Sequence, residues 1–198
     1  MKKIALALMV AGICATPSMA SAESNPYVSI SAGLAPMHSQ DIKIGSVTYD
    51  SAIDYKSGLA IEGAVGTKID NYRAELAIGY QSNDMDNIVG ITISDVEISL
   101  LSYMANGYMD FKMDGEVSPY LMGGVGFTTI TGKSGSASTD DTVIAYQVGA
   151  GVSMEASENV AIDLGYRYFA TGEADGLIDE WTASFASSKI LLGMRYSF

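Results

Sequence analysis

The stretch "SSKILLGMRYSF" (residues 187–198) decides the fold of this chain. Its bulkiest side chains recur at every second position and alternate with a second set that contains charges and glycine. The first set is Ile190, Leu192, Met194, Tyr196 and Phe198, and the second is Lys189, Leu191, Gly193, Arg195 and Ser197. A period of two residues is that of a β-strand with two different faces. The segment therefore predicts a strand that ends on an aromatic residue.

The same period of two residues runs through the rest of the chain, in place of the 3.6-residue period of an amphipathic helix. Eight segments show it, and each is long enough for the ~9–11 residues that a tilted transmembrane strand needs, with some extension beyond the bilayer. They are residues 27–35, 56–68, 72–82, 95–111, 118–131, 143–155, 160–170 and 187–198.

The two faces of these segments differ in an informative way. One face is continuously apolar, with tyrosines near its ends, whereas the other holds glycine, small polar residues and isolated charges. A soluble sandwich usually has a bulky inward face and an outward face rich in Lys, Glu and Thr. Here the polar face fits the crowded interior of a narrow barrel, and the tyrosines fit an aromatic girdle at a membrane boundary.

Short and long connections alternate strictly along the chain. The short ones are residues 69–71, 112–117 and 156–159, and the long ones are residues 36–55, 83–94, 132–142 and 171–186. An open sheet edge in hydrocarbon costs several kcal/mol per unpaired backbone group, so the sheet is expected to close on itself. We predict an all-β fold, an eight-stranded antiparallel up-and-down transmembrane β-barrel with three periplasmic turns and four extracellular loops.

The beginning of the chain has the form of a secretory signal peptide. Residues 1–3 are a short basic start, residues 4–15 are apolar, and "ASA" at residues 20–22 fits a cleavage site. We expect residues 1–22 to be removed and residues 23–198 to form the barrel domain. Cys14 follows Ile13 rather than the small residue of a lipoprotein signal, so we interpret it as a hydrophobic residue of the signal. The predicted location is the bacterial outer membrane.

Composition excludes several classes of protein. The chain has 23 acidic and 11 basic residues, a net charge of −12, which argues against nucleic-acid binding because that needs a basic face. No cysteine follows the predicted signal, so disulfides, thiol chemistry and His/Cys metal clusters are not expected. The mean hydropathy is nevertheless +0.19, and no apolar run after the signal approaches 18 residues. Charged and apolar residues must therefore be segregated.

Several stretches resemble a known family. The stretch "AYQVGAGVSMEASENVAIDLGYRYF" (145–169) resembles the penultimate hairpin of that family. The stretch "SYMANGYMDF" (102–111) resembles its fourth strand, and "SPYLMGGVGF" (118–127) resembles its fifth strand. The family is that of the opacity proteins and major surface antigens, small outer-membrane barrels like outer-membrane proteins A and X. The terminal "RYSF" (195–198) is similar to the assembly signal of outer-membrane barrels, which implies that the barrel-assembly machinery reads Tyr196 and Phe198. The resemblance implies functions carried by loops: adhesion, immune exposure, envelope stability or a small pore.

Charged residues of both signs fall on the face that is expected to point into the barrel. They are Glu62, Arg73, Glu75, Asp110, Asp163, Arg167, Lys189 and Arg195. Isolated charges in a low-dielectric interior are costly, so we expect them to pair. Eight strands enclose a space just wide enough for side chains to fill, which favours a salt-bridge network that plugs the lumen. A narrow polar pathway for ions or small solutes is the alternative.

The expected extracellular loops carry two features. They are acidic, with only Lys43 and Lys133 opposing many carboxylates. The simplest interpretation of these charges is that they keep the loops soluble. The alternative interpretation is that divalent cations bridge them to lipopolysaccharide phosphates, although no loop has the spaced oxygen ligands of a calcium site. In the fourth loop, four apolar residues form either an exposed contact patch or a lid over the barrel mouth. They are Leu177, Ile178, Trp181 and Phe185.

We therefore predict a non-enzymatic surface protein, in which a rigid barrel anchors loops that contact a host, a neighbouring cell or lipopolysaccharide. A narrow porin-like channel is the alternative, and a soluble lipocalin-like binder is disfavoured by the apolar outer face. The single histidine, His38, is too isolated to indicate a general base, and nothing indicates a cofactor or metal. Expected partners are outer-membrane lipids and lipopolysaccharide, the barrel-assembly machinery, and a host or cell-surface ligand; we expect a monomer.

Overall fold

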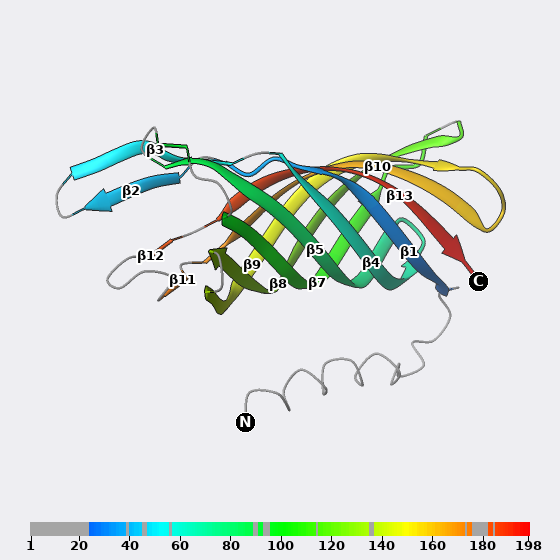
Figure 1. The fold of residues 1–198 in the computed structure, drawn as a ribbon. Coiled ribbons are helices and arrows are strands. Elements are labelled where there is room, and N and C mark those ends of the chain that lie inside the picture. Colours follow the sequence, from blue (N-terminus) through cyan, green and yellow to red (C-terminus); the bar gives the residue numbers. More distant parts are fainter. Residues whose placement is uncertain are drawn as a thin grey trace, which may run out of the picture.

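The chain folds into a closed antiparallel β-barrel (Figure 1). The computed structural model describes residues 24–38, 40–44, 47–55, 57–88, 91–92, 96–113, 115–134, 137–172, 174–175, 182–183 and 185–198. The eight barrel strands are β1 (Ser24–Ala35), β4 (Gly58–Ile69), β5 (Tyr72–Ile88), β7 (Val96–Asp110), β8 (Val117–Ser134), β9 (Ala137–Glu155), β10 (Val160–Thr171) and β13 (Ala186–Ser197). No helix within the described residues is long and apolar enough to cross a membrane.

Each barrel strand pairs with its neighbours along the chain, and the last strand closes the barrel against the first. In that seam Tyr27–Leu34 of β1 lie antiparallel to residues 190–197 of β13. The fold prediction is thus confirmed. The start of β1 and the end of β13 lie at one end of the barrel together with the short connections, and we call this the turn end (Figure 1). The opposite end, with the long connections, is the loop end.

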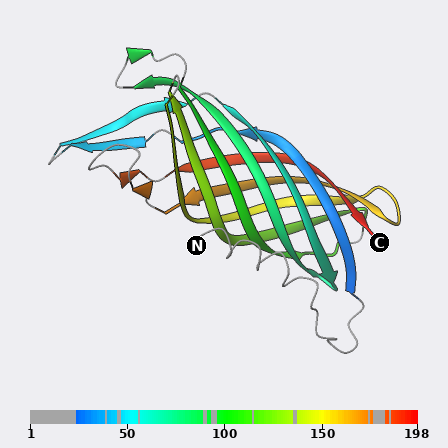
Figure 2. The ribbon, with the colours of Figure 1, turned by 60° about the horizontal axis from the view of Figure 1, so that its bottom comes forward.

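The strands are strongly tilted (Figure 2). Cross-strand pairs lead from Tyr27 once around the barrel, through Gly66, Glu75, Asn106, Gly124, Gln147, Phe169 and Ser187. Ser187 is bridged to Met37, just beyond β1, so one circuit ends ten residues further along the chain, at position 37 instead of 27. At ~3.3 Å per residue and ~4.7 Å between strands, this shear gives a tilt of about 40°. A barrel of this size holds side chains and no wide channel.

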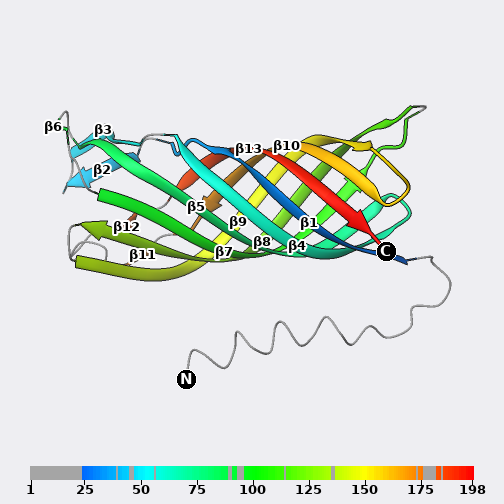
Figure 3. The same ribbon diagram turned by 45° about the vertical axis from the view of Figure 1, so that its right-hand side comes forward.

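Short strands lie beyond the barrel at the loop end, and the last two of them form a sheet of their own (Figures 1 and 3). They are β2 (Gln40–Ile44), β3 (Val47–Tyr55), β6 (Ile91–Thr92), β11 (Ala174–Asp175) and β12 (Thr182–Ala183). The third long connection was expected at 132–142. Most of it instead continues the β8–β9 hairpin, in which Ser134 pairs with Ala137. Continued backbone pairing, with threonines that favour strands, explains the difference.

The outer face of the barrel is an apolar belt with aromatic residues at its margins. On β5 the exposed outward row runs from Tyr72 through Ile78 to Tyr80. These tyrosines are eight residues apart, so a tilt of about 40° separates them by roughly 20 Å along the barrel axis. On β13 the outward row is Ile190, Leu192, Met194 and Tyr196, as the alternation predicted. The belt has the height and composition of a lipid-facing surface.

The interior of the barrel changes character along its axis. Near the loop end an apolar cluster crosses the lumen, with Ile130 0% and Phe185 4% exposed. We call this cluster the apolar cap; it consists of Met37, Ala77, Ile98, Leu100, Met104, Ile130, Val143, Ala145, Phe169 and Phe185. Buried Gln81 and Asn83 lie beside this cluster on the neighbouring strand. Toward the turn end the lumen is polar and charged. The sequence analysis expected glycine, small polar residues and isolated charges on the inner face and did not predict the apolar cap.

Candidate functional site: the barrel lumen

All eight charged residues predicted to face inward lie inside the barrel. Seven are buried: Glu62, Arg73, Glu75, Asp110, Arg167, Lys189 and Arg195. The side chain of Asp163 is 18% exposed. Each is positioned by the alternation of its strand, because every second side chain of a barrel strand points to the lumen.

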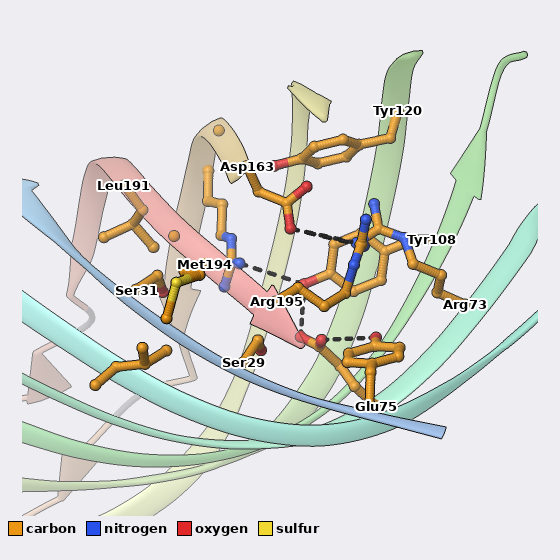
Figure 4. Close-up of a pocket in the computed structure, with 15 residues that line it drawn as sticks. Ser29, Ser31, Arg73, Glu75, Tyr108, Tyr120, Asp163, Leu191, Met194 and Arg195 are labelled. Atoms are coloured by element: carbon orange, nitrogen blue, oxygen red, sulfur yellow. Dashed lines mark hydrogen bonds and ion pairs between the residues drawn. The ribbon is translucent and has the colours of Figure 1, made fainter. Parts of the chain in front are cut away.

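An ion-pair cluster occupies the turn end of the lumen. The Arg73 guanidinium donates to Asp110 Oδ1 from Nη2 at 2.8 Å and from Nε at 3.0 Å. Asp163 Oδ2 lies 3.9 Å from Arg73 and 3.6 Å from Arg195, so this carboxylate is shared by two arginines (Figure 4). Lys68, which the sequence interpretation did not include, lies 3.7 Å from Asp110 at the rim. Oppositely charged groups therefore compensate one another where burial makes isolated charge costly.

Glu75 lies next to this cluster and is held by neutral donors. Tyr27 Oη donates to its Oε2 at 3.0 Å, while Asn106 Nδ2 and Tyr108 Oη donate to its Oε1 at 3.0 and 2.6 Å. Gln147 extends this network by donating to Asn106 Oδ1 at 2.8 Å. Three hydrogen bonds satisfy a buried carboxylate without an ion pair.

A second group of charges lies between the first cluster and the apolar cap. Arg167 forms an ion pair with Glu62 across the lumen and also donates to Tyr108 Oη at 3.2 Å. Lys189 is paired in register with Arg167 on the neighbouring strand, and its Nζ lies 4.0 Å from the centre of the Phe169 ring. Among the described residues Lys189 forms no ion pair, but it interacts electrostatically with Glu62. Glu62 thus forms an ion pair with one buried cation and acts electrostatically on a second.

Three tyrosines that the sequence analysis did not assign to either face lie inside the barrel. Tyr27, Tyr108 and Tyr120 are buried in the lumen, where the Arg73 guanidinium lies 4.3 and 4.9 Å from the ring centres of Tyr108 and Tyr120. Their phase along the strand was the available signal, because Tyr108 is two residues from the inward Asp110. Glycine makes room for these rings: a Cβ on Gly165 would lie 2.4 Å from Tyr120 Oη.

Little free space remains between these side chains. A cavity of about 30 Å³ lies between the ion-pair cluster and the β1–β13 seam, lined among others by Ser29, Ser31 and Arg195 (Figure 4). A cavity of this size holds one or two water molecules. No group of three or more His, Cys, Asp or Glu side chains in the described part of the chain could hold a metal ion.

The other predicted sites lie at the two ends of the barrel. Phe185 does not belong to an exposed patch: it is buried in the apolar cap, and its amide donates to Thr171 Oγ1 at 2.9 Å, which directs the ring inward. Leu177, Ile178 and Trp181 lie outside the described residues. At the turn end Phe198 is 71% exposed beside the Tyr196 ring, with 5.4 Å between ring centres.

A closed eight-stranded barrel with an apolar outer belt and a plugged polar lumen defines a class, the small outer-membrane β-barrel proteins. The family model described as "Outer membrane protein beta-barrel domain" matches residues 5–198, and the chain belongs to this family. It is a protein of the bacterial outer membrane. In such barrels the short turns face the periplasm and the longer loops face the exterior, so the turn end is periplasmic and the loop end extracellular.

Individual relatives agree with this assignment. The outer membrane protein PagN of Salmonella typhimurium is 27% identical over 122 residues, which cover 52% of this chain and 51% of that protein. The chain thus spans about half the length of this curated relative. The structure of Neisserial surface protein A is similar with a TM-score of 0.64 and 23% identity, over 87% of this chain and 97% of the other. A major outer membrane protein of Thermus thermophilus matches with a TM-score of 0.52 and 13% identity, over 89% and 100%.

Proposed function

We propose that this protein is a closed outer-membrane scaffold that presents its extracellular loops for binding at the cell surface. The observation that supports this best is the filled lumen. The apolar cap lies above two layers of ion pairs and hydrogen bonds, and the cavity near the β1–β13 seam is only about 30 Å³. A barrel filled in this way serves as an anchor, and what differs from one anchor to another is its loops.

The loops suggest the chemistry of a partner. Their sequence is acidic, with residues such as Asp41, Asp50, Asp86 and Asp179 opposed by few lysines. A basic surface on a host or neighbouring cell would be attracted to such loops, whereas lipopolysaccharide phosphates would need a bridging divalent cation. Outer-membrane lipids and the barrel-assembly machinery are the further partners that we propose, with a monomeric barrel and no enzymatic activity.

Adhesion of bacteria that display loop variants tests the proposal. We expect the triple variant Leu177→Ser, Ile178→Ser and Trp181→Ser to lose most adhesion to epithelial monolayers, because apolar residues in an exposed loop commonly mediate contact. Phe185 is left unchanged because it belongs to the apolar cap.

The matched control changes a comparable set of apolar residues in the second loop, with Ile88→Ser, Val89→Ser and Ile91→Ser. Surface amounts are equalised with an antibody to an added tag. Equal adhesion of the wild type and a strain without the protein would contradict the proposed function.

The alternative function, a narrow channel, is tested by conductance. We expect the purified barrel to be silent in a planar lipid bilayer, because side chains fill the lumen and leave only a cavity of about 30 Å³ near the β1–β13 seam. Steady single-channel openings that disappear in Arg167→Ala or Glu75→Ala would establish the channel instead.

We also propose that residues 1–22 are removed on export, leaving a barrel domain of residues 23–198. The mass of the protein extracted from outer membranes measures this directly. A retained N-terminal segment would contradict the cleavage site at Ala20-Ser21-Ala22.

A further inference from the structure

The apolar belt of the barrel contains a hollow on one side. On the outer faces of β5, β7 and β8, a groove of about 420 Å³ is lined by Tyr72, Met109 and Leu121, with Gly107 and Gly123 at its floor. The walls are 60%, 41% and 53% exposed, so they stand out from the barrel. The groove is open because its central positions have no side chains.

The floor of the groove is a row of small residues that lie directly beside one another. Ala74 is paired with Gly107, and Gly107 with Gly123. A Cβ added to Gly123 would meet nothing within 4 Å, and one on Gly107 would meet only the Gly123 carbonyl oxygen at 4.0 Å. Neither glycine is therefore required by close packing within the barrel, since a larger side chain would extend outward without a clash.

The position of the groove limits what can fill it. Tyr72 follows the β4–β5 turn, and Met109 lies near the end of β7, so the groove lies in the periplasmic half of the belt. This is the phospholipid leaflet of the outer membrane. Phe111 continues the outward row of β7 to the membrane boundary, and exposed Lys112 follows it. Lys112 forms no ion pair with any described residue, so its ammonium group is available to a lipid phosphate.

We propose that this groove binds one glycerophospholipid of the periplasmic leaflet, with an acyl chain along the Gly107–Gly123 floor and the phosphate at Lys112. An acyl chain is flexible and narrow enough to follow the floor, and it gains dispersion contacts with the walls that a smooth barrel surface does not offer. A symmetric second copy fits less well, because an isologous contact would place two hollows face to face and leave a void between them.

Native mass spectrometry of the full-length barrel tests the site. The barrel is reconstituted into vesicles of phosphatidylethanolamine and phosphatidylglycerol and then released in mild detergent. We expect the wild type to retain one phospholipid. The variant Gly107→Leu with Gly123→Leu fills the groove, and its retained fraction should fall about tenfold.

Gly63→Leu is the matched control. Gly63 also faces outward, and a Cβ there would meet only the Ser29 carbonyl oxygen at 4.0 Å, but it lies on β4 away from the groove. We expect Gly63→Leu to retain lipid as the wild type does. Lys112→Gln should lower retention and Lys112→Arg should restore it, because the arginine keeps the charge.

Several outcomes would overturn the proposal. Equal retention by the filled variant and the wild type would remove the groove as the site, and loss in Gly63→Leu as well would show a general effect on the belt. A dimer in the wild type that the filled variant loses would assign the groove to a second copy instead. Retention that depends on the glycines but not on Lys112 would refute the phosphate contact. Shifted gel mobility of unheated samples verifies folding of each variant.

Discussion

Glu62 is the acid that two buried cations of the lumen share, and its replacement by glutamine tests this arrangement. The substitution keeps the size of the side chain and removes its charge. Arg167 loses its ion-pair partner, and Lys189, paired in register with Arg167, loses the attraction of the Glu62 charge. Removing one partner of a buried pair costs about 3–5 kcal/mol. Because two cations remain uncompensated, we expect Glu62→Gln to cost about 5 kcal/mol of the free energy of unfolding.

The reverse substitution should cost much less. In Arg167→Met the charge of Lys189 still acts on Glu62, and the main loss is the hydrogen bonding of the guanidinium to Glu62 and to Tyr108 Oη. A hydrogen bond to a charged group contributes ~1.5–3 kcal/mol, so we expect a loss of about 2 kcal/mol. In the double variant a single cation is left without an acid, and the expected loss is about 4 kcal/mol. Adding Arg167→Met to Glu62→Gln should therefore recover about 1 kcal/mol.

Urea titration of the barrel in lipid vesicles measures these differences, with the folded fraction read from the mobility of unheated samples. With an m-value of ~2 kcal/mol/M, Glu62→Gln should lower the midpoint by roughly 2–3 M. Lys68→Met is the control: Lys68 is 28% exposed and Asp110 keeps Arg73, so the change should stay below about 1 kcal/mol. If Arg167→Met cost as much as Glu62→Gln, or if the two changes were additive, Glu62 would not be shared.

Three further predictions follow from other parts of the molecule. Gly165→Ala should destabilise the barrel by about 1–3 kcal/mol, because the new methyl group would overlap the Tyr120 hydroxyl. Adding Tyr120→Phe should restore most of the lost stability, because the nearest remaining ring atom is 3.5 Å from the Cβ position. Urea titration measures both variants, and a lack of rescue would contradict the role of the hydroxyl. Deletion of Phe198 should impair insertion while export continues, and normal surface amounts would count against an assembly role. Adhesion through the acidic loops should weaken as salt rises from about 0.05 to 0.5 M, and salt-independent adhesion would exclude an electrostatic contact.

The direction of the side chains was predictable in strands whose two faces differ in composition, because there it depends only on the alternation of one strand. Arg73 and Glu75 point inward while Tyr72 and Tyr80 point outward, as their phase requires. The apolar cap was not predicted. Near the start of β7, Ile98, Leu100 and Leu101 are all apolar, so composition does not distinguish the inner from the outer face there, although Leu100 is buried and Leu101 exposed. Where both faces of a strand are apolar, the direction of its side chains is determined only by pairing with neighbouring strands whose alternation is clear.

Which charges meet inside the barrel depends on its closure and not on any single strand. The contact between Asp163 and Arg195 joins neighbouring strands, whereas Arg167 reaches Glu62 across the lumen, and that contact requires the shear of ten residues. The inward neighbours of Glu62 on β4 are Ala60 and Ala64. A shear of eight or twelve residues would therefore move Arg167 toward an alanine and leave a buried arginine without an acid, at a cost of about 3–5 kcal/mol. The lumen charges thus favour the observed shear of ten residues over a shear of eight or twelve. The outer belt is apolar in every register, so it does not distinguish these three ways of closing the barrel.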